Sequence, residues 1–554
     1  MKQNNNNCFV SIFEICHRHT TKGGLVILSL ITFIMIVGAI WLFAYTRSRS
    51  VKTDSAEGYF LAGRSLTGIT IAGTIIMTNL STEQIVGQNG QSYASGMEVM
   101  AWEVTSAIAI VLLALVFLPK YLKYGVDTVT DFIESRYDKT TKRIASFLFI
   151  FTYMTSFLPV VLYSGSLVFN QIFAVDQLLG VEPLTAVAFI AGLTGLIGLL
   201  YLLMGGLRLS AFSDTVYGIA LLVGGLTIPV LGLMALGDGN FFRGMETIQA
   251  NTPEKLNSIG AIDSAYVPWP TLFLGMFFNN LFFWCTNQMI VQKALAGRNL
   301  KESQKGALYV GFFKIFGALF LVFPGIIAFN LFGGELRTAD NAYPRLVTEV
   351  LPPSVEGIFA AIIFGAILSS FVGALNATAT LFTLDFYKPL IKKDASDRQV
   401  ARAGKLITVI VALIAILIAP LISFAPSGLY NVVQSFNGLY SMPLLVIIIL
   451  GFYFKYGTAF AAKVTFITHV VLYGIFWLFM DYHYLYAFSV LFFVDILVLW
   501  LVSRLKPIDK PFEFQENINK VDMTPWKHRK WVSAVIIITV VATYLLFSPI
   551  GLAG

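Results

Sequence analysis

A run of polar residues, 78–90, lies inside a segment that is otherwise apolar enough for lipid. The run contains amides, hydroxyls and the carboxylate of Glu83. Polar groups without partners are costly in hydrocarbon, so such a run persists only where it lines a wet cavity or a binding site. Secondary transporters use interrupted, polar membrane helices to hold an ion and a solute near the middle of the bilayer. The run therefore predicts a broken helix at a binding site.

A second polar run, 278–288, places two amide clusters around Phe282, Phe283 and Trp284. Asn and Gln also join membrane helices by hydrogen bonds, which is the alternative interpretation. The two runs occur five predicted spans apart, however, and an interrupted helix opening each half is typical of inverted-repeat transporters. We therefore expect two broken helices in equivalent positions.

The adjacent serines Ser369 and Ser370 are a third candidate feature. Serines in membrane helices often donate to their own backbone. A small hard cation, in contrast, needs about five or six oxygens, which hydroxyls and carbonyls released at a helix break supply without a full charge. We expect the two serines to face the break in 78–90.

Three isolated charges, Glu103, Asp214 and Lys314, fall within predicted spans, where a charge costs about 3 kcal/mol or more unless it is paired or hydrated. An interfacial position for Asp214 and a mutual Glu103–Lys314 ion pair are the alternatives to a binding role. A ring of donors and acceptors covered by aromatic side chains would suit an uncharged, polyhydroxylated solute. The ring residues are Glu103, Lys314, Gln84, Asn280 and Gln434, and the aromatic residues are Trp102, Phe283, Trp284 and Phe436.

The elements that position these residues are membrane helices. Of 554 residues, 56% are hydrophobic and 12% are charged, whereas a soluble domain has about 25% charged residues. At roughly 20 apolar residues per span, the sequence predicts an all-α polytopic membrane protein with about 14 transmembrane helices. Their ranges are 24–45, 67–89, 97–118, 144–170, 183–204, 214–236, 268–292, 307–331, 356–383, 402–423, 427–451, 459–480, 484–504 and 530–550.

The distribution of the 38 Lys and Arg residues supports this count. Nearly all fall in alternate loops, Lys142 and Lys293 among them, and positive charge marks the cytoplasmic side. We therefore expect a multi-pass protein of the plasma or inner cell membrane with both termini extracytoplasmic. The first span is followed by no small-residue cleavage site, which indicates a retained helix rather than a signal peptide.

The composition also excludes other classes of function. The net charge of +7 follows from the loop charges, so nothing indicates nucleic acid or an obligate protein partner. The sequence shows no catalytic triad, no glycine-rich phosphate loop and no clustered His and Cys residues for a catalytic metal. We expect a transporter and not an enzyme.

Five short motifs resemble the solute:sodium symporter family, and within it the sodium/sugar (glucose/galactose) cotransporter branch. They lie at 58–64, 79–87, 205–207, 304–306 and 376–382, and the resemblance extends over about 58–510. It implies a LeuT-type five-plus-five inverted repeat with two broken helices and sodium-driven alternating access. The implied organisation is an extracytoplasmic tail (1–23), a leading helix (24–45), a first repeat (67–236), a second repeat (268–451) and peripheral C-terminal helices (459–554).

The resemblance also implies which residues form the sites. Sodium is the coupling ion, with Asp214 on its exit path to the inside. Its ligands are implied to be the backbone carbonyls of Met77, Leu80 and Ala366 and the hydroxyls of Ser369 and Ser370. The sugar is implied to contact Gln84, Glu103, Ser106, Asn280, Lys314 and Gln434.

Three departures from the family pattern shape the expected function. Phe283 and Trp102 stand at gate positions where the family commonly has Tyr, and 371–373 lack the hydroxyls that follow the serine pair in two-sodium members. We expect symport of a hexose or closely related sugar or polyol with one sodium per solute. The alternatives are another cargo (an inositol, a sugar acid or a sulfated sugar), a sodium-dependent sugar sensor without transport, and proton coupling through Glu103 or Asp214.

Overall fold

The computed structural model describes residues 28–48, 55–336, 338–424, 429–480, 482–514 and 521–554. Over these ranges the chain forms helices and no strand, apart from an isolated bridge between Leu66 and Gly297. Ten of the described helices are long and apolar enough to cross a membrane. Broken and shorter helices provide further spans, so the chain is the all-α polytopic protein that the sequence predicts. The expected tail, 1–23, and the beginning of the span 24–45 lie outside the described residues.

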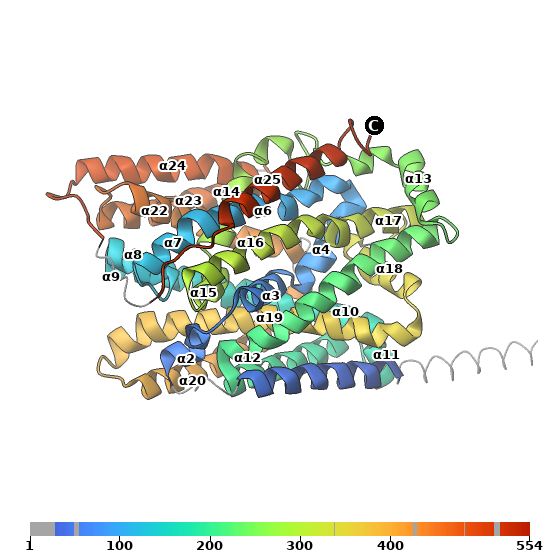
Figure 1. Cartoon of the computed structure of the whole chain (residues 1–554), viewed down its shortest axis with the longest axis horizontal. Coiled ribbons are helices and arrows are strands. Elements are labelled where there is room, and N and C mark those ends of the chain that lie inside the picture. Colours follow the sequence, from blue (N-terminus) through green and yellow to red (C-terminus); the bar gives the residue numbers. More distant parts are fainter. Residues whose placement is uncertain (1–27, 49–54, 337, 425–428, 481, 515–520) are drawn as a thin grey trace, which may run out of the picture.

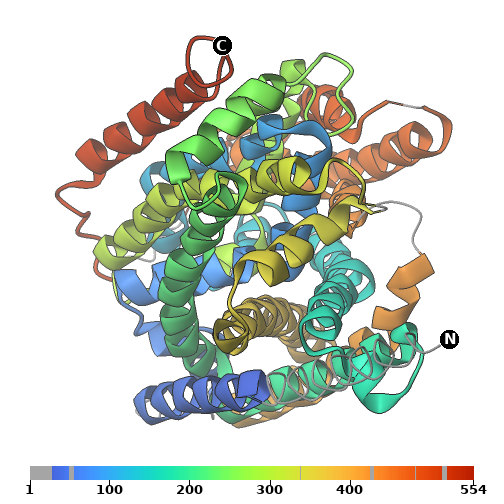
Figure 2. The same cartoon turned by 90° about the vertical axis from the view of Figure 1, so that its right-hand side faces the viewer.

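The membrane helices run roughly parallel to one another, from left to right in Figure 1, and Figure 2 shows several of them end-on. The part before residue 240 contains α2 (Ala56–Phe60), η1 (Ala62–Arg64), α3 (Gly68–Asn79), α4 (Thr82–Ser95), η2 (Met97–Met100), α5 (Ala101–Val104), α6 (Ser106–Leu112), η3 (Leu113–Phe117), α7 (Leu118–Lys123), α8 (Val129–Arg136), α9 (Lys139–Thr152), η4 (Tyr153–Phe157), α10 (Leu158–Phe173), α11 (Val175–Leu179) and α12 (Pro183–Leu236). Helices α8 and α9 lie at the left end in Figure 1, and α11 lies toward the right.

The run 78–90 contains a helix break, which confirms the break that the sequence predicts. Helix α3 ends at Asn79, and α4 begins at Thr82. Leu80 leaves the helical conformation at φ −85° and ψ 68°, and Ser81 is extended at φ −83° and ψ 170°. The last carbonyl groups of α3 and the first N–H groups of α4 are therefore released from the helical ladder.

The later part of the chain contains a second broken helix. Helix α14 (Gly275–Cys285) ends before Thr286, and α15 (Gln288–Leu295) begins after Asn287. Asn287 Oδ1 accepts hydrogen bonds from Met289 N–H at 3.0 Å and from the Tyr153 hydroxyl at 2.7 Å. The Asn287 side chain thus caps α15 and is itself held by Tyr153 of η4. In this way a backbone N–H group released at the break has a hydrogen-bond partner without water.

The remaining elements surround the two broken helices. Those between the halves are α13 (Phe241–Asn251), η5 (Pro253–Leu256) and η6 (Trp269–Thr271). The second half continues with α16 (Leu300–Gly317), η7 (Ala318–Val322), α17 (Phe323–Phe332), η8 (Ala339–Asn341), α18 (Ala342–Val350), α19 (Pro353–Phe382), η9 (Thr383–Ile391), α20 (Asp397–Ile418), η10 (Ala419–Phe424), α21 (Leu429–Asn437) and α22 (Ser441–Tyr453).

Helix α12 contains two of the predicted spans, 183–204 and 214–236, joined at Gly206. Gly206 adopts φ 56° and ψ −156°, and a Cβ there would lie 2.7 Å from the carbonyl oxygen of Tyr59. The join therefore requires glycine for its conformation and for its close packing. Beyond it, Thr215 lies so close to α3 that a Cβ on Gly73 would be 2.6 Å from the Thr215 Cα. This contact brings the neighbouring Asp214 against α3.

Three long helices contain a π-helical turn just before a proline: η3 before Pro119, η4 before Pro159 and η7 before Pro324. Proline has no N–H to donate, and its ring crowds the preceding turn. A wider turn relieves that crowding and changes the direction of the side chains it carries. One of the re-aimed side chains is Phe157 of η4, which lines the cavity described below.

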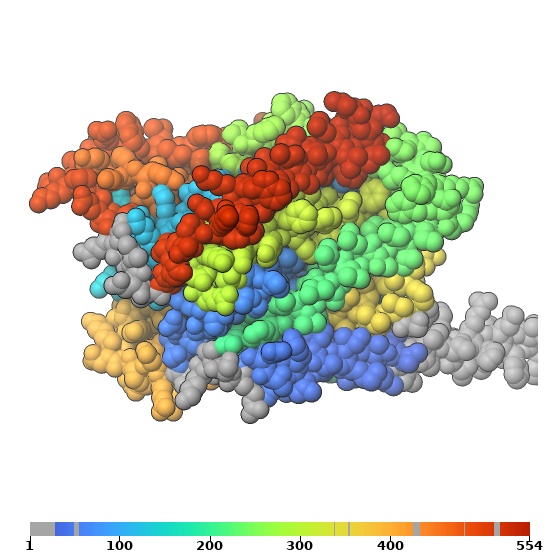
Figure 3. All heavy atoms as spheres, in the orientation of Figure 1, coloured from blue at the N-terminus to red at the C-terminus, as the bar shows by residue number. Residues whose placement is uncertain are grey.

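Four helices lie at the periphery: Leu28–Ser48, α23 (Ala459–Phe479), α24 (Tyr484–Leu505) and α25 (Arg529–Leu546). Figure 3 shows α25 crossing obliquely over α16, with Leu28–Ser48 along the opposite edge of the molecule. In the most apolar window, 11% of the residues of Leu28–Ser48 and 17% of those of α25 are buried. These helices therefore present apolar side chains outward, as contact with lipid requires.

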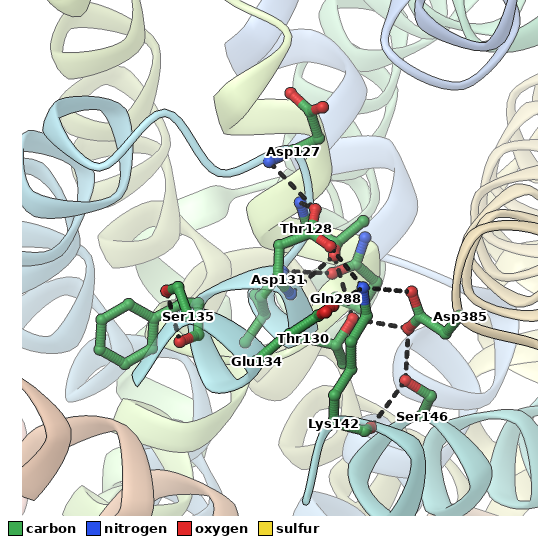
Figure 4. A network of polar contacts seen from close by, with 12 residues as sticks. Asp127, Thr128, Thr130, Asp131, Glu134, Ser135, Lys142, Ser146, Gln288 and Asp385 are labelled. Carbon is green, nitrogen blue, oxygen red and sulfur yellow. Dashed lines mark hydrogen bonds and ion pairs between the residues drawn. The ribbon is translucent and has the colours of Figure 1, made fainter. Parts of the chain in front are cut away.

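A buried polar network ties the α8–α9 hairpin to η9 at the end of α19 (Figure 4). Lys142 Nζ lies 2.7 Å from Asp131 Oδ1, 2.8 Å from Glu134 Oε2 and 3.0 Å from Asp385 Oδ1. Asp385 also accepts hydrogen bonds from the hydroxyls of Thr130 and Ser146. The sequence suggested a loop position for Lys142, and this was wrong: Lys142 is buried, because three carboxylates from two elements converge on it.

We predict that Lys142→Met lowers the melting temperature of the protein in detergent, measured by intrinsic tryptophan fluorescence. The substitution leaves the buried Asp385 without its cation, and removing one partner of a buried ion pair costs about 3–5 kcal/mol. Lys139→Met, on an exposed residue of the same helix, is the matched control and should leave the melting temperature unchanged. Equal melting temperatures for the two variants would contradict a stabilising role for the network.

Candidate functional site

The serine pair of α19 lies against the break between α3 and α4, where the sequence led us to expect it. The Ser370 hydroxyl donates to the carbonyl oxygens of Thr78 at 2.9 Å and of Met77 at 3.2 Å. Ser369 Oγ lies 3.1 Å from Thr78 Oγ1. Both serines are fully buried. The carbonyl groups released at the end of α3 are thus met by hydroxyls from the other half of the chain.

Leu80 and Ala366, the other two residues implied to bind sodium, are fully buried in the same two segments. Leu80 is the C-cap residue of α3, and Ala366 lies one turn before Ser370 on α19. Backbone carbonyls and hydroxyls are uncharged oxygen ligands of the kind that hard cations accept. The region between α3 and α19 therefore has the ligand types of a sodium site.

Asp214 is deep inside the protein, so the interfacial interpretation of this residue was wrong. The side chain is 2% exposed and accepts hydrogen bonds from Thr74 Oγ1 at 2.6 Å and Ser210 Oγ at 3.0 Å. Its ionic partner is Lys293 of α15, with Nζ 3.6 Å from Asp214 Oδ2. Placing Lys293 in a loop was also wrong: α15 continues inward, and Lys293 is buried. The sequence contained a single signal for the Asp214–Lys293 ion pair: Asp214 fell within a predicted span, and no partner had been assigned to it.

Beside the break lies a cavity of about 50 Å³. By volume it holds a few water molecules, each of which needs roughly 10–15 Å³. Seven of the predicted sugar and gate residues line it: Gln84, Trp102, Asn280, Phe283, Trp284, Lys314 and Gln434. Seven further lining residues were not assigned to the site from the sequence: Thr78, Asn79, Glu83, Phe157, Asn279, Val433 and Asn437.

Glu103 lies behind the cavity wall and organises it. Its Oε1 accepts from Gln84 Nε2 at 2.5 Å and from Gln88 Nε2 at 2.9 Å, and its carboxylate forms an ion pair with Lys314. Both charged side chains are buried, at 0% and 1% exposure. A Cβ on Gly317, one turn after Lys314, would lie 2.8 Å from Glu103 Oε2. The carboxylate therefore reaches Lys314 because α16 has a glycine at that position.

Lys314 connects this pair to the helix break, since its Nζ donates to Asn79 Oδ1 at 2.7 Å and lies 5.4 Å from the centre of the Trp284 ring. Asn280 Nδ2 donates to Thr105 Oγ1 at 2.7 Å. Ser106 donates to the Glu103 carbonyl at 2.5 Å and lies outside the cavity lining, as does the half-buried Phe436. Of the six predicted sugar residues, Gln84, Asn280, Lys314 and Gln434 line the cavity, whereas Glu103 and Ser106 lie behind its wall.

Some of the lining residues that were not assigned from the sequence could have been found there by one of two signals. Asn79, Glu83 and Asn279 belong to the two polar runs and could have been included on that basis. Asn437 follows Gln434 by three residues, so the two share a helix face. Phe157 had no sequence signal, because its direction depends on the π-helical turn η4.

A second cavity, of about 460 Å³, lies near the network of Figure 4. Charged residues from several elements line it, among them Glu57, Arg64, Asp127, Lys388 and Asp397. Arg64 bridges its wall through an ion pair with Asp127 at 2.5 Å. This cavity lies at the end of the bundle where the predicted cytoplasmic loops gather.

Two broken helices, oxygens gathered at a break and an amide-lined cavity beside it define a secondary transporter of the LeuT type. The sequence model of the sodium:solute symporter family matches residues 59–468. The chain belongs to this family, and it is a transporter and not an enzyme.

Similar proteins of known sequence include bacterial and animal symporters. The chain is 43% identical to the uncharacterized symporter YidK of Escherichia coli over 96% of this chain and 92% of that protein. It is 31% identical to the sodium/glucose cotransporter of Vibrio parahaemolyticus over 77% of this chain and 80% of that protein. It is 26% identical to the human sodium/myo-inositol cotransporter 2 over 77% of this chain and 66% of that protein.

Similar solved structures have the same fold. A substrate-bound, outward-open sodium-coupled sialic acid symporter superposes with a TM-score of 0.75 at 19% identity, covering 88% of this chain and 99% of that one. The nucleobase-cation-symport-1 family transporter Mhp1 superposes with a TM-score of 0.53 at 14% identity, covering 82% and 96%. These likenesses establish the LeuT-type architecture.

We predict that Glu103→Gln and Lys314→Met each lower the melting temperature in detergent, while the double variant recovers much of the loss. Each single substitution leaves one buried charge without its partner, at about 3–5 kcal/mol, whereas the double substitution removes both charges. The measurement is a double-mutant cycle on thermal unfolding. If the loss of stability in the double variant equals the sum of the losses in the two single variants, Glu103 and Lys314 are not coupled.

Proposed function

We propose that this protein imports a hexose, or a closely related uncharged sugar or polyol, together with one sodium ion by alternating access. The observation that carries this proposal is the position of the amide-lined cavity directly beside the oxygens at the α3–α4 break. Asn79, whose side chain bonds Lys314 at the cavity, is the last residue of α3, and Thr78 and Met77 before it offer carbonyls to Ser370. Ion and solute would thus share one short segment.

The solute class follows from the groups that face the cavity. Amides from Gln84, Asn279, Asn280, Gln434 and Asn437 both donate and accept hydrogen bonds, which suits hydroxyl groups. Trp102, Phe283 and Trp284 supply flat apolar surfaces for the faces of a sugar ring. This combination favours a polyhydroxylated ring.

The charges around the cavity favour a neutral solute over an acidic one. Glu83 and Glu103 are two buried carboxyl groups, and Lys314 is the one ammonium among the residues that line the cavity. Because Lys314 is already paired with Glu103, an anionic solute would bring a further negative charge toward Glu83. A sugar acid or a sulfated sugar is therefore a poorer candidate than a hexose or an inositol.

The names of the relatives support the same class, since they include a sodium/glucose and a sodium/myo-inositol cotransporter. An inositol is thus the nearest alternative cargo. A sodium-dependent sensor without transport is the other alternative. The charged cavity of about 460 Å³ at one end of the bundle is a polar space of the kind that a transporter needs for release of its solute.

The proposed coupling is mechanical. Sodium bound by the carbonyls of Met77, Leu80 and Ala366 and by Ser369 and Ser370 joins α3 to α19 and completes the solute pocket beside the break. Solute binding closes the aromatic gate residues, and sodium then leaves past Asp214 toward the inside. A membrane potential of about 100 mV favours entry of the charge by about 2.3 kcal/mol. Proton coupling through Glu103 or Asp214 is disfavoured, because each carboxylate already has a lysine partner.

The domain organisation, the membrane location and the side of the membrane on which the termini lie are part of the same proposal. We infer two inverted repeats, 67–236 and 268–451, with peripheral helices before and after them. The distribution of Lys and Arg supports a plasma or inner membrane location with both termini extracytoplasmic.

We predict that proteoliposomes containing the protein accumulate labelled glucose or galactose under an inward sodium gradient, but not when potassium replaces sodium. Gln84→Ala should abolish this uptake, because it removes an amide from the cavity, while Gln177→Ala, on an exposed residue of α11, should not. Uptake of myo-inositol alone would replace the hexose by the nearest alternative. Sodium-dependent binding without accumulation would identify a sensor.

We predict that Ser370→Ala raises the sodium concentration for half-maximal uptake by about tenfold, which corresponds to about 1.4 kcal/mol of sodium binding. The physical reason is the loss of a hydroxyl ligand between α3 and α19. Ser166→Ala is the matched control, because Ser166 is equally buried and donates to Leu162 of its own helix. An unchanged sodium dependence in Ser370→Ala would remove α19 from the ion site.

A further inference from the structure

The buried Lys293 has no part in the sodium and solute scheme above. It lies on α15 with its side chain 1% exposed. Its Nζ donates to the Thr74 carbonyl at 3.1 Å and to Thr78 Oγ1, and lies 3.6 Å from Asp214 Oδ2. An ammonium group has three protons to donate. The three oxygens, from α3 and α12, thus form a small buried cluster around a cation that belongs to the chain.

This oxygen cluster adjoins the proposed sodium site, and Thr78 belongs to both. The Thr78 hydroxyl that contacts Lys293 also lies 3.1 Å from Ser369 Oγ. The Thr78 carbonyl accepts the hydrogen bond of Ser370 at 2.9 Å. Two neighbouring groups of oxygen atoms therefore lie along the end of α3, and the Lys293 ammonium lies at one of them.

The opposite helix leaves space for the ammonium. Gly373 lies one turn after Ser369 on α19, and a Cβ at Gly373 would lie 3.3 Å from Lys293 Nζ and 3.2 Å from Thr78 Oγ1. Both distances are tighter than ordinary van der Waals contact. A larger residue at Gly373 would press on the ammonium and on the hydroxyl it binds.

Charge decides what this cluster can hold. Asp214 is its acidic member, and Lys293 neutralises it. A carboxylate, a hydroxyl and a backbone carbonyl are all ligands that a hard cation accepts. Without the lysine the cluster would be an anionic oxygen site next to the first one. With the lysine present, a sodium ion at the same oxygens would meet a like charge at contact distance.

We infer that Lys293 is a built-in cation that occupies a second sodium position and thereby limits the transporter to one sodium per solute. The inference rests on the proposed sodium coupling and assigns its stoichiometry to one residue. Lys293 is a positioning residue, since it acts by filling the cluster and not by touching the solute.

The experiment counts bound sodium in the purified full-length protein in detergent, using radioactive sodium at saturation, and so does not depend on the identity of the solute. We expect one sodium per wild-type chain and two per Lys293→Ala chain. Lys293→Arg, which keeps the positive charge, should bind one. Lys293→Ala combined with Asp214→Asn, which removes the anionic ligand of the vacated position, should also bind one.

The possible outcomes separate this inference from the proposed function. One sodium per Lys293→Ala chain, or two per wild-type chain, would overturn the role of Lys293. The melting temperature of Lys293→Ala, measured in sodium and in choline, tests whether the variant folds. If the variant stays unfolded in saturating sodium, sodium does not replace the ammonium, and the inference is overturned as well. No sodium bound by the wild type would contradict sodium coupling itself.

Discussion

The hydrogen bonds from Ser370 to the carbonyl groups of Met77 and Thr78 join the two halves of the chain at a helix break, where backbone groups lack helical partners. Inside a bilayer, no solvent satisfies the groups released at a helix break, so the protein must provide partners itself. The first break therefore needs α19 beside it, and the second, at Asn287, needs η4. These two requirements fix which elements pack against the breaks.

Two buried ion pairs flank the first break, and each joins an element of the first half to one of the second. Glu103 and Lys314 lie on the side of the cavity, and Asp214 and Lys293 lie on the side of the serine pair. A buried pair is stable only while both partners remain together. If the two halves move apart, these four charged side chains therefore need other partners. Under the proposed function, sodium, solute and water are those partners, which is how their binding would be linked to opening and closing.

The surrounding frame keeps these contacts in place. The join at Gly206 carries Asp214 against α3, and the π-helical turn η4 directs Phe157 into the cavity. At one end of the bundle, Lys142 ties the α8–α9 hairpin to Asp385 beyond α19. Among the peripheral helices, α24 supports the site through Tyr484, which stacks on Trp102, and their outer faces provide apolar surface for lipid. The positions of Asp214 and Phe157 at the centre of the protein thus depend on local irregularities, the Gly206 join and the π-helical turn η4, in otherwise regular helices.

The sequence by itself determined the membrane helices, both breaks, and the presence of Glu103 and Lys314 as two opposite charges within spans that could pair with each other. These follow locally, because the thickness of hydrocarbon and the cost of polar groups within it apply to each segment separately. Only the tertiary structure decided that Lys293 is buried against Asp214 and that Asn437 lines the cavity. Such contacts depend on how far a helix continues inward, how it is rotated and how closely its neighbours approach. These quantities are set by packing between segments that lie far apart in the chain.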